Sequence, residues 1–168
     1  MRHFTAFRGI SGRRFVMKKI LFVCHGNICR STMAEFVMKE LVRRAGLSEE
    51  ILVGSAACRR DELGSDTHRG TKAVLREKGI PFTKRQAVLL LREDYNKYDY
   101  IIGMDDENMR DLPRILGEDR EHKTHLLMDF AGEHREVADP WYTGNFDATY
   151  RDVWKGCQGL LRHLQSNM

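Results

Sequence analysis

Ile20-Leu21-Phe22-Val23-Cys24-His25-Gly26-Asn27-Ile28-Cys29-Arg30-Ser31 is the stretch of sequence that decides the fold. Its first four residues form a short apolar run of the kind found in buried parallel strands. A segment with helical spacing follows, from Thr32 toward Arg44. Between the two lie a cysteine and an arginine that are five residues apart. This order predicts a strand, a tight loop and the N-terminus of a helix.

Such a loop can bind a tetrahedral oxyanion. The backbone N–H groups would face the anion, and the helix N-terminus would add positive potential. We expect these N–H groups to come from His25, Gly26, Asn27, Ile28, Cys29 and Arg30. Arg30 also offers a planar fork for two oxygens, and Cys24 would lie beneath the bound group as a thiolate nucleophile. The pattern therefore predicts a phosphatase that forms a covalent phosphocysteine.

The residue types within the loop suit this role. Gly26 and Asn27 tolerate positive φ, which a tight loop needs. Ser31 can cap the helix that follows, and its hydroxyl can also donate a hydrogen bond to a thiolate. The Cys-x5-Arg spacing is a weak motif on its own. Its place at the carboxyl end of an expected strand strengthens it, because open α/β sheets bind ligands there.

The rest of the chain alternates apolar runs with helical segments. Further strands are expected at 51–53, 100–104 and, more weakly, 125–128. Helices are expected before Gly79, at 106–116 with a break or kink at Pro113, and along the apolar stripe of 153–164. The alternation predicts an α/β fold, with a single doubly wound four-stranded parallel sheet, helices on both faces and the phosphate loop after the first strand.

Composition limits the possible classes. A chain of 168 residues suits one domain, and its net charge of +4 is interspersed, which does not favour a nucleic-acid partner. The four cysteines do not form a disulfide scaffold, and no spacing indicates a metal site or a cofactor. No apolar run reaches membrane-spanning length, and a catalytic thiol favours the cytoplasm. We interpret residues 1–16 as a disordered or non-native extension, and 17–168 as the domain.

Two separated motifs carry a family resemblance. The stretch from Phe22 to Glu35 resembles the signature of the low-molecular-weight protein tyrosine phosphatases, and Asp139-Pro140-Trp141-Tyr142 resembles their second motif. The resemblance covers about 18–164. It implies hydrolysis of phosphotyrosine in proteins, with inhibition by phosphate or other oxyanions. It further implies Cys24 as nucleophile, Arg30 as phosphate clamp and Asp139 as general acid and base.

The resemblance also implies supporting roles. Asn27 and Ser31 would hold the shape of the loop, while Ile28, Trp141 and Tyr142 would form the substrate pocket. Asp105 is a second carboxylate that could support the site or cap the helix after Met104.

The remaining cysteines have separate interpretations. Cys29 could form a reversible disulfide with Cys24 under oxidant, or it could simply be a packed thiol. Cys157 belongs to an apolar helix stripe and is expected in the core. Cys58 precedes two arginines and is expected to be exposed.

The chain departs from the family pattern in two places. Thr32 stands where proline is common, and the loop at 58–62 lacks an aromatic residue, which leaves the substrate preference open.

Three other functions compete with phosphotyrosine hydrolysis. Protein arginine phosphatases resemble this chain but carry threonine at the position of Ile28. A thiol-coupled arsenate reductase would need a further cysteine in 75–91, which has none. An inactive phosphate-binding module would not need Cys24, Arg30 and Asp139 together.

Overall fold

The protein folds around a four-stranded sheet. The computed structural model describes residues 17–168, so the interpretation of residues 1–16 as an extension lies outside the described part. All strand pairs are parallel, and their order is β2-β1-β3-β4. The strands are β1 (Lys18–Cys24), β2 (Ile51–Ala57), β3 (Tyr100–Gly103) and β4 (Thr124–Leu126).

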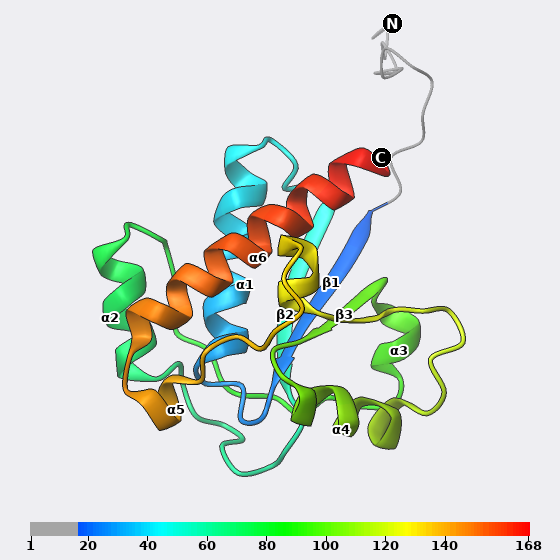
Figure 1. Cartoon of the computed structure of the whole chain (residues 1–168), viewed down its shortest axis with the longest axis horizontal. Coiled ribbons are helices and arrows are strands. Elements are labelled where there is room, and N and C mark those ends of the chain that lie inside the picture. The colour runs from blue at the N-terminus through cyan, green and yellow to red at the C-terminus, as the bar shows by residue number, and fades with distance from the viewer. Residues whose placement is uncertain (1–16) are drawn as a thin grey trace, which may run out of the picture.

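Helices cover both faces of this sheet, so the predicted fold class is confirmed (Figure 1). Three helices lie on one face, namely α1 (Arg30–Arg44), α2 (Arg69–Glu77) and α6 (Phe146–Ser166). The other face carries α3 (Asp94–Lys97) and α4 (Asp106–Leu116). The 3-10 helix η1 (Leu127–Ala131) follows β4, and the short helix α5 (Pro140–Thr143) precedes α6.

Strand β1 lies between two hydrophobic cores, which explains its unbroken apolar run. Ile20 and Phe22 pack into the larger core with α1 and α6. Leu21 and Val23 point to the other face and pack with the apolar side of α4. Because both faces of the strand are covered, neither tolerates polar residues at these positions.

The carboxyl end of β1 is the point where the strand order reverses. The chain runs from β1 through α1 to β2 on one side, and it later crosses to β3 on the other side of β1. The connection after β1 leads outward to β2, whereas the connection after β3 leads outward to β4, so the loops at the carboxyl ends of these two neighbouring strands diverge. Open α/β sheets bind ligands at such a crevice. The loop of residues 25–29 begins at this position.

A cap expected for one helix and a break expected within another are both absent. Helix α1 begins at Arg30, so Ser31 lies inside its first turn and does not cap it; Cys29 occupies the N-cap position without a side-chain cap. Helix α4 continues through Pro113 without a break. Buried Leu112 and Leu116 hold it against the sheet on both sides of the proline, so packing outweighs the missing hydrogen bond.

The two cysteines outside the loop have different outcomes. Cys157 is fully buried on α6, as predicted. Cys58 is also buried, so the expectation that it is exposed is wrong. Its N–H donates to the carbonyl of Cys24 over 2.9 Å, which keeps the chain beside the sheet beyond the end of β2. Within residues 17–168, none of the helices is long and apolar enough to cross a membrane.

Candidate active site

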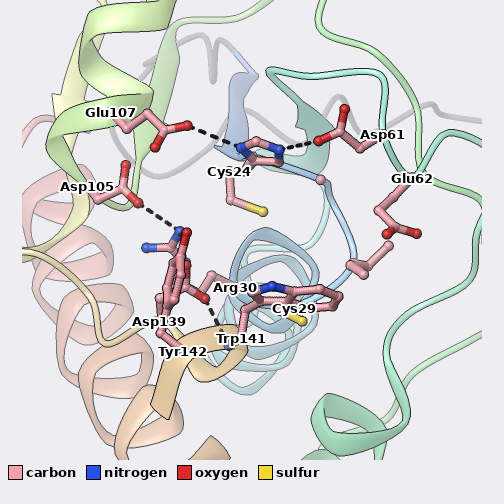
Figure 2. A pocket seen from close by; sticks show the side chains of 13 residues that line it. Cys24, Cys29, Arg30, Asp61, Glu62, Asp105, Glu107, Asp139, Trp141 and Tyr142 are labelled. Atoms are coloured by element: carbon pink, nitrogen blue, oxygen red, sulfur yellow. Dashed lines mark hydrogen bonds and ion pairs between the residues drawn. The ribbon is translucent and has the colours of Figure 1, made fainter. Parts of the chain in front are cut away.

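A pocket of about 210 Å³ opens at the carboxyl end of β1 (Figure 2). Its walls come from the loop after β1, the segment after β2, the start of α4 and the start of α5. The lining residues are Cys24, His25, Gly26, Ile28, Cys29, Arg30, Asp61, Glu62, Asp105, Glu107, Asp139, Trp141 and Tyr142. Segments distant in sequence therefore meet around the cysteine and the arginine of the first motif.

Cys24 is the last residue of β1 and lies at the base of this pocket. It is largely buried, and its Sγ lies 3.0 Å from the Oγ of Ser31. A hydroxyl at this distance can donate its proton to a thiolate. Ser31 therefore reaches Cys24 from the first turn of α1, although it does not cap that helix.

Asn27 holds the loop in a left-handed conformation. Its φ is +59°, and its side chain is fully buried. Its Nδ2 donates to the Oγ of Ser31 over 2.8 Å and to the Oγ of Ser55 over 2.9 Å. Asparagine is one of the few residue types that adopt this backbone region readily.

Gly26 differs from the expectation, because it is not among the residues with positive φ. A Cβ on Gly26 would lie 3.1 Å from the Cγ of Glu62, so its small size allows the segment after β2 to approach closely. Asn27 alone in this loop carries the left-handed conformation.

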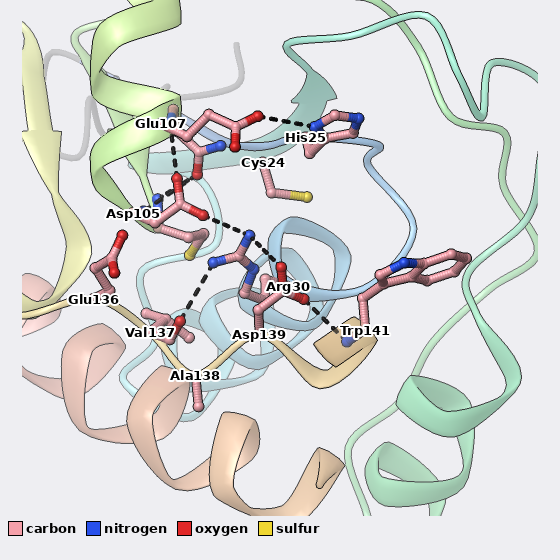
Figure 3. A network of polar contacts seen from close by, with 12 residues as sticks. Cys24, His25, Arg30, Asp105, Glu107, Glu136, Val137, Ala138, Asp139 and Trp141 are labelled. Atoms are coloured by element: carbon pink, nitrogen blue, oxygen red, sulfur yellow. Dashed lines mark hydrogen bonds and ion pairs between the residues drawn. The ribbon is translucent and has the colours of Figure 1, made fainter. Parts of the chain in front are cut away.

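Arg30 is almost entirely buried and contacts two carboxylates (Figure 3). Its Nη2 lies 2.7 Å from Oδ2 of Asp105 and 3.2 Å from Oδ2 of Asp139, while its Nη1 donates to the carbonyl of Val137 over 3.3 Å. Burial opposes the charge, but Cys24, Asp105 and Asp139 together hold the pKa of Arg30 above its ordinary value. These contacts fix the position of the guanidinium in the pocket.

The two carboxylates are anchored differently. Asp105 caps α4 through a reciprocal pair of contacts with Asn108, and its Oδ1 accepts from the Asn108 N–H over 2.8 Å. Asp139 caps the four-residue helix α5 and accepts from the N–H of Trp141 over 3.0 Å. Both expected roles of Asp105 are therefore present in its contacts, and Asp139 also acts as the turn residue that an Asp-Pro sequence favours.

The three residues expected to form the substrate pocket lie in its lining. Ile28 is buried, whereas Trp141 and Tyr142 are 66% and 85% exposed. The aromatic pair thus stands at the open end of the pocket, where it is free to contact a ligand.

Cys29 also lies in the lining and is buried. Burial, with Cys24 and Asp139 nearby, raises the pKa of its thiol to about 12. All four cysteines are free in the structure. Among residues 17–168, no three His, Cys, Asp or Glu side chains converge as a metal site would require.

Comparison with known proteins now decides the family. The model of the low molecular weight phosphotyrosine protein phosphatases matches residues 19–168. The chain belongs to this family. It is 37% identical to the low molecular weight protein-tyrosine-phosphatase YfkJ of Bacillus subtilis over 151 residues, which are 89% of this chain and 97% of that protein.

Solved structures agree with this assignment. The crystal structure of Bacillus subtilis YfkJ matches with a TM-score of 0.88 and 36% identity, covering 92% of this chain and 99% of that one. A low molecular weight protein tyrosine phosphatase of Streptococcus pyogenes matches with a TM-score of 0.80 and 40% identity, covering 88% and 93%. This low molecular weight phosphatase therefore shares its fold with these relatives over nearly their whole length.

Three residues around the loop were not predicted from the sequence. Ser55 donates to Oε1 of Glu35 over 2.5 Å, which continues the hydrogen-bond network from Asn27. Arg85 donates to the carbonyl of Asn27 over 2.6 Å and also contacts its Oδ1. Glu35 lies in the first stretch that carries the family resemblance, but no local pattern distinguishes Arg85.

Proposed function

We propose that this phosphatase hydrolyses phosphotyrosine in proteins through a phosphocysteine, with Cys24 as nucleophile, Arg30 as phosphate clamp and Asp139 as general acid and base. The observation that supports it most directly is that all three side chains line one pocket, where Arg30 already contacts Asp139. Residues of the first motif and the second motif are 109 positions apart in sequence but meet in space.

The first chemical step follows from these positions. The Cys24 thiolate attacks phosphorus in line with the tyrosyl oxygen, so an S–P bond forms while the P–O bond breaks. Arg30 hydrogen-bonds two phosphoryl oxygens, and the loop N–H groups stabilise the charge that develops on them. These N–H groups are those of His25, Gly26, Asn27, Ile28, Cys29 and Arg30. Protonated Asp139 transfers its proton to the departing phenolate, which leaves as tyrosine.

The second step regenerates the enzyme. The Asp139 carboxylate accepts a proton from water, and that water attacks phosphorus. The S–P bond breaks, inorganic phosphate leaves and Cys24 returns to the thiolate, which the Ser31 hydroxyl stabilises at 3.0 Å. Asn27 and Ser31 hold the loop in the shape that this cycle requires.

Asp139 is preferred over Asp105 as the acid because of how each is held. Each carboxylate caps a helix with its other oxygen, but Asp105 makes the shorter contact with Arg30. Asp139 makes a longer contact, and its side chain is more exposed, at 26% against 15%. We therefore assign Asp105 to the orientation of Arg30 and Asp139 to proton transfer.

The partners follow from the same site. We expect a tyrosine-phosphorylated protein as substrate, with phosphate and other oxyanions as inhibitors. Vibrio vulnificus Wzb, which is 26% identical with a TM-score of 0.77, has been solved in complex with benzylphosphonate, an aromatic oxyanion. Because the chemistry needs a free thiolate, we place the enzyme in a reducing compartment such as the cytoplasm.

Phosphoarginine is the second candidate substrate. An arginine phosphatase of Drosophila matches with a TM-score of 0.81 and 28% identity, so this fold supports both activities. Here Ile28 lines the pocket, and its bulk favours a flat phenol ring over a guanidinium. Wild type should therefore prefer phosphotyrosine peptide to phosphoarginine peptide, and Ile28→Thr should shift this ratio toward phosphoarginine.

The mechanism is tested by three variants and two substrates. Cys24→Ser should abolish hydrolysis of p-nitrophenyl phosphate, and chelators should not affect wild type. Asp139→Asn should slow phosphotyrosine turnover about 10²–10⁴-fold, the usual contribution of a general acid. With an activated ester such as p-nitrophenyl phosphate, Asp139→Asn should slow formation of the phosphocysteine less than with phosphotyrosine. This variant should then release a burst of p-nitrophenol, followed by slow turnover.

Asp105→Asn is the matched control for this experiment. It removes one carboxylate from the same arginine, so it should slow both substrates alike. If Asp105→Asn rather than Asp139→Asn shows the dependence on the leaving group, the acid is Asp105. Activity in Cys24→Ser at the wild-type level would refute the phosphocysteine.

A further inference from the structure

The imidazole of His25, the residue after the proposed nucleophile, bridges two carboxylates at the rim of the pocket. Its Nε2 lies 2.5 Å from Oδ2 of Asp61, and its Nδ1 lies 3.1 Å from Oε1 of Glu107. Figure 3 shows the contact with Glu107, and Figure 2 shows Asp61 and Glu107 on opposite sides of the space above Cys24. Nothing in the proposed reaction uses this side chain.

Two acceptors on one imidazole define its protonation state. Neutral histidine has a single N–H donor, and its other nitrogen carries a lone pair that repels a carboxylate. Only the imidazolium can donate to Asp61 and Glu107 together. The hydrogen bond with Asp61 is the main cause that raises the pKa of His25, with Glu107 adding to it and burial opposing both.

The bridge joins two walls of the pocket. Asp61 belongs to the segment after β2, which lines the pocket and lies against Gly26 through Glu62. Glu107 belongs to the first turn of α4, two residues after the Asp105 that contacts Arg30. The backbone of His25 reaches the same segment, because its carbonyl accepts from the N–H of Arg59 over 3.0 Å.

We propose that protonated His25 is a positioning residue that clamps the segment after β2 to the start of α4 and so holds the mouth of the pocket in its substrate-binding shape. This role rests on the proposed phosphatase function. The charged groups on the elements packed around the imidazole are Arg59, Asp61 and Glu62 after β2, Asp105 and Glu107 at α4, and Arg30 of α1. Of these, only Asp61 and Glu107 contact the imidazole within residues 17–168.

Deprotonation should therefore open one side of the clamp. Below the pKa of His25 both contacts are charge-assisted, and above it at most one N–H remains to serve two acceptors. The side chains involved are 43–66% exposed, so each contact is worth little by itself. We expect the effect to fall mainly on KM, because the clamp shapes the rim rather than the reacting atoms.

The first experiment follows the imidazole itself by NMR titration of the full-length protein, with the His25 signal assigned from its loss in His25→Gln. In wild type the pKa should lie above that of an ordinary histidine. In the double variant Asp61→Asn with Glu107→Gln it should fall back toward the ordinary value. Glu62→Gln removes a charge from the same rim without touching the imidazole, and it should leave the titration nearly unchanged.

The second experiment measures KM for a phosphotyrosine peptide across the same pH range. The ratio of KM in the double variant to KM in wild type cancels the ionisation of the substrate. At pH values below the pKa of His25, this ratio should be roughly two to five, the size expected for exposed ion pairs. At pH values above that pKa, the ratio should approach one. The corresponding ratio for Glu62→Gln should not change with pH, and kcat should change less than KM.

The two experiments separate this inference from the proposed function. If His25 titrates as an ordinary histidine in wild type and in the double variant, the clamp does not exist, whatever the activity. If the titration shifts as expected but the KM ratio is independent of pH, the clamp forms without positioning the pocket, and the proposal is refuted. If Cys24→Ser remains active, the proposed mechanism fails while the titration result stands.

Discussion

Replacement of Asn27 tests how much of the loop depends on one buried side chain. Its Nδ2 donates to Ser31 and Ser55, and its Oδ1 accepts from the Val88 N–H over 3.2 Å and contacts Arg85. In Asn27→Ala the two hydroxyls can find other partners, but the Val88 N–H and the guanidinium of Arg85 lose an acceptor. An unsatisfied buried donor costs about 1–3 kcal/mol, and these two part-buried donors should cost about 1 kcal/mol each. With about 1–2 kcal/mol of backbone strain for alanine at a φ of +59°, we expect Asn27→Ala to lower the free energy of unfolding by about 3–4 kcal/mol.

Asn27→Gly should be less damaging, although it removes the same side-chain contacts. The φ of +59° strains alanine by about 1–2 kcal/mol but does not strain glycine. The greater freedom of glycine in the unfolded chain offsets about half of the stability that is gained by avoiding this strain. The glycine variant should therefore be about 1 kcal/mol more stable than the alanine variant.

Urea unfolding at constant pH measures both differences, provided that the slope m stays the same. Asn96 gives the matched control, since it is exposed on α3 and is not among the residues with positive φ. There the order should reverse, with Asn96→Gly less stable than Asn96→Ala. The reasoning is refuted if Asn27→Gly is less stable than Asn27→Ala, or if both remain within about 1 kcal/mol of wild type.

Three further predictions concern oxidation, acid and packing. After hydrogen peroxide, a dithiol should restore wild type better than Cys29→Ser, because a disulfide with Cys24 traps the sulfenic acid; equal recovery would remove this protective role. Burial alone would raise the pKa of Asp119, but the hydrogen bonds that it accepts outweigh burial and lower this pKa from 3.8 to about 2. The carboxylate therefore stabilises the fold above pH 3.8, and this stabilisation is lost as the pH falls toward 2. Over this range, Asp119→Asn should lose less free energy of unfolding than wild type in an acid titration. In Gly159→Ala, the new Cβ would lie 2.0 Å from the carbonyl oxygen of Phe130. Overpacking of this kind costs roughly 1–3 kcal/mol, so the melting temperature should fall by several degrees. An unchanged melting temperature would contradict the packing of α6 on η1.

The fold could be predicted from the sequence because its signals are local. A strand covered on both faces must be apolar throughout, and β1 shows this over consecutive positions. The failures arose where a local rule met tertiary packing. Pro113 should break a helix, but Leu112 and Leu116 hold α4 against the sheet, and Cys58 precedes charged residues yet continues beside β1. In each case the deciding contact comes from a part of the chain that local patterns do not include.

The residues of the site likewise divide into those that local sequence predicts and those that only the tertiary structure brings together. Residues of the loop could be assigned expected roles because strand, loop and helix are consecutive, so the geometry of an anion site follows from their order. Arg85 could not, because it lies 58 residues from Asn27, and the structure brings the two together only through the long segment between α2 and β3. A half-buried arginine there has no periodic pattern, and burial lowers its pKa while nearby carboxylates oppose this. The support of the loop therefore depends on topology, whereas its chemistry depends on local sequence, and only the second is visible before the chain is folded.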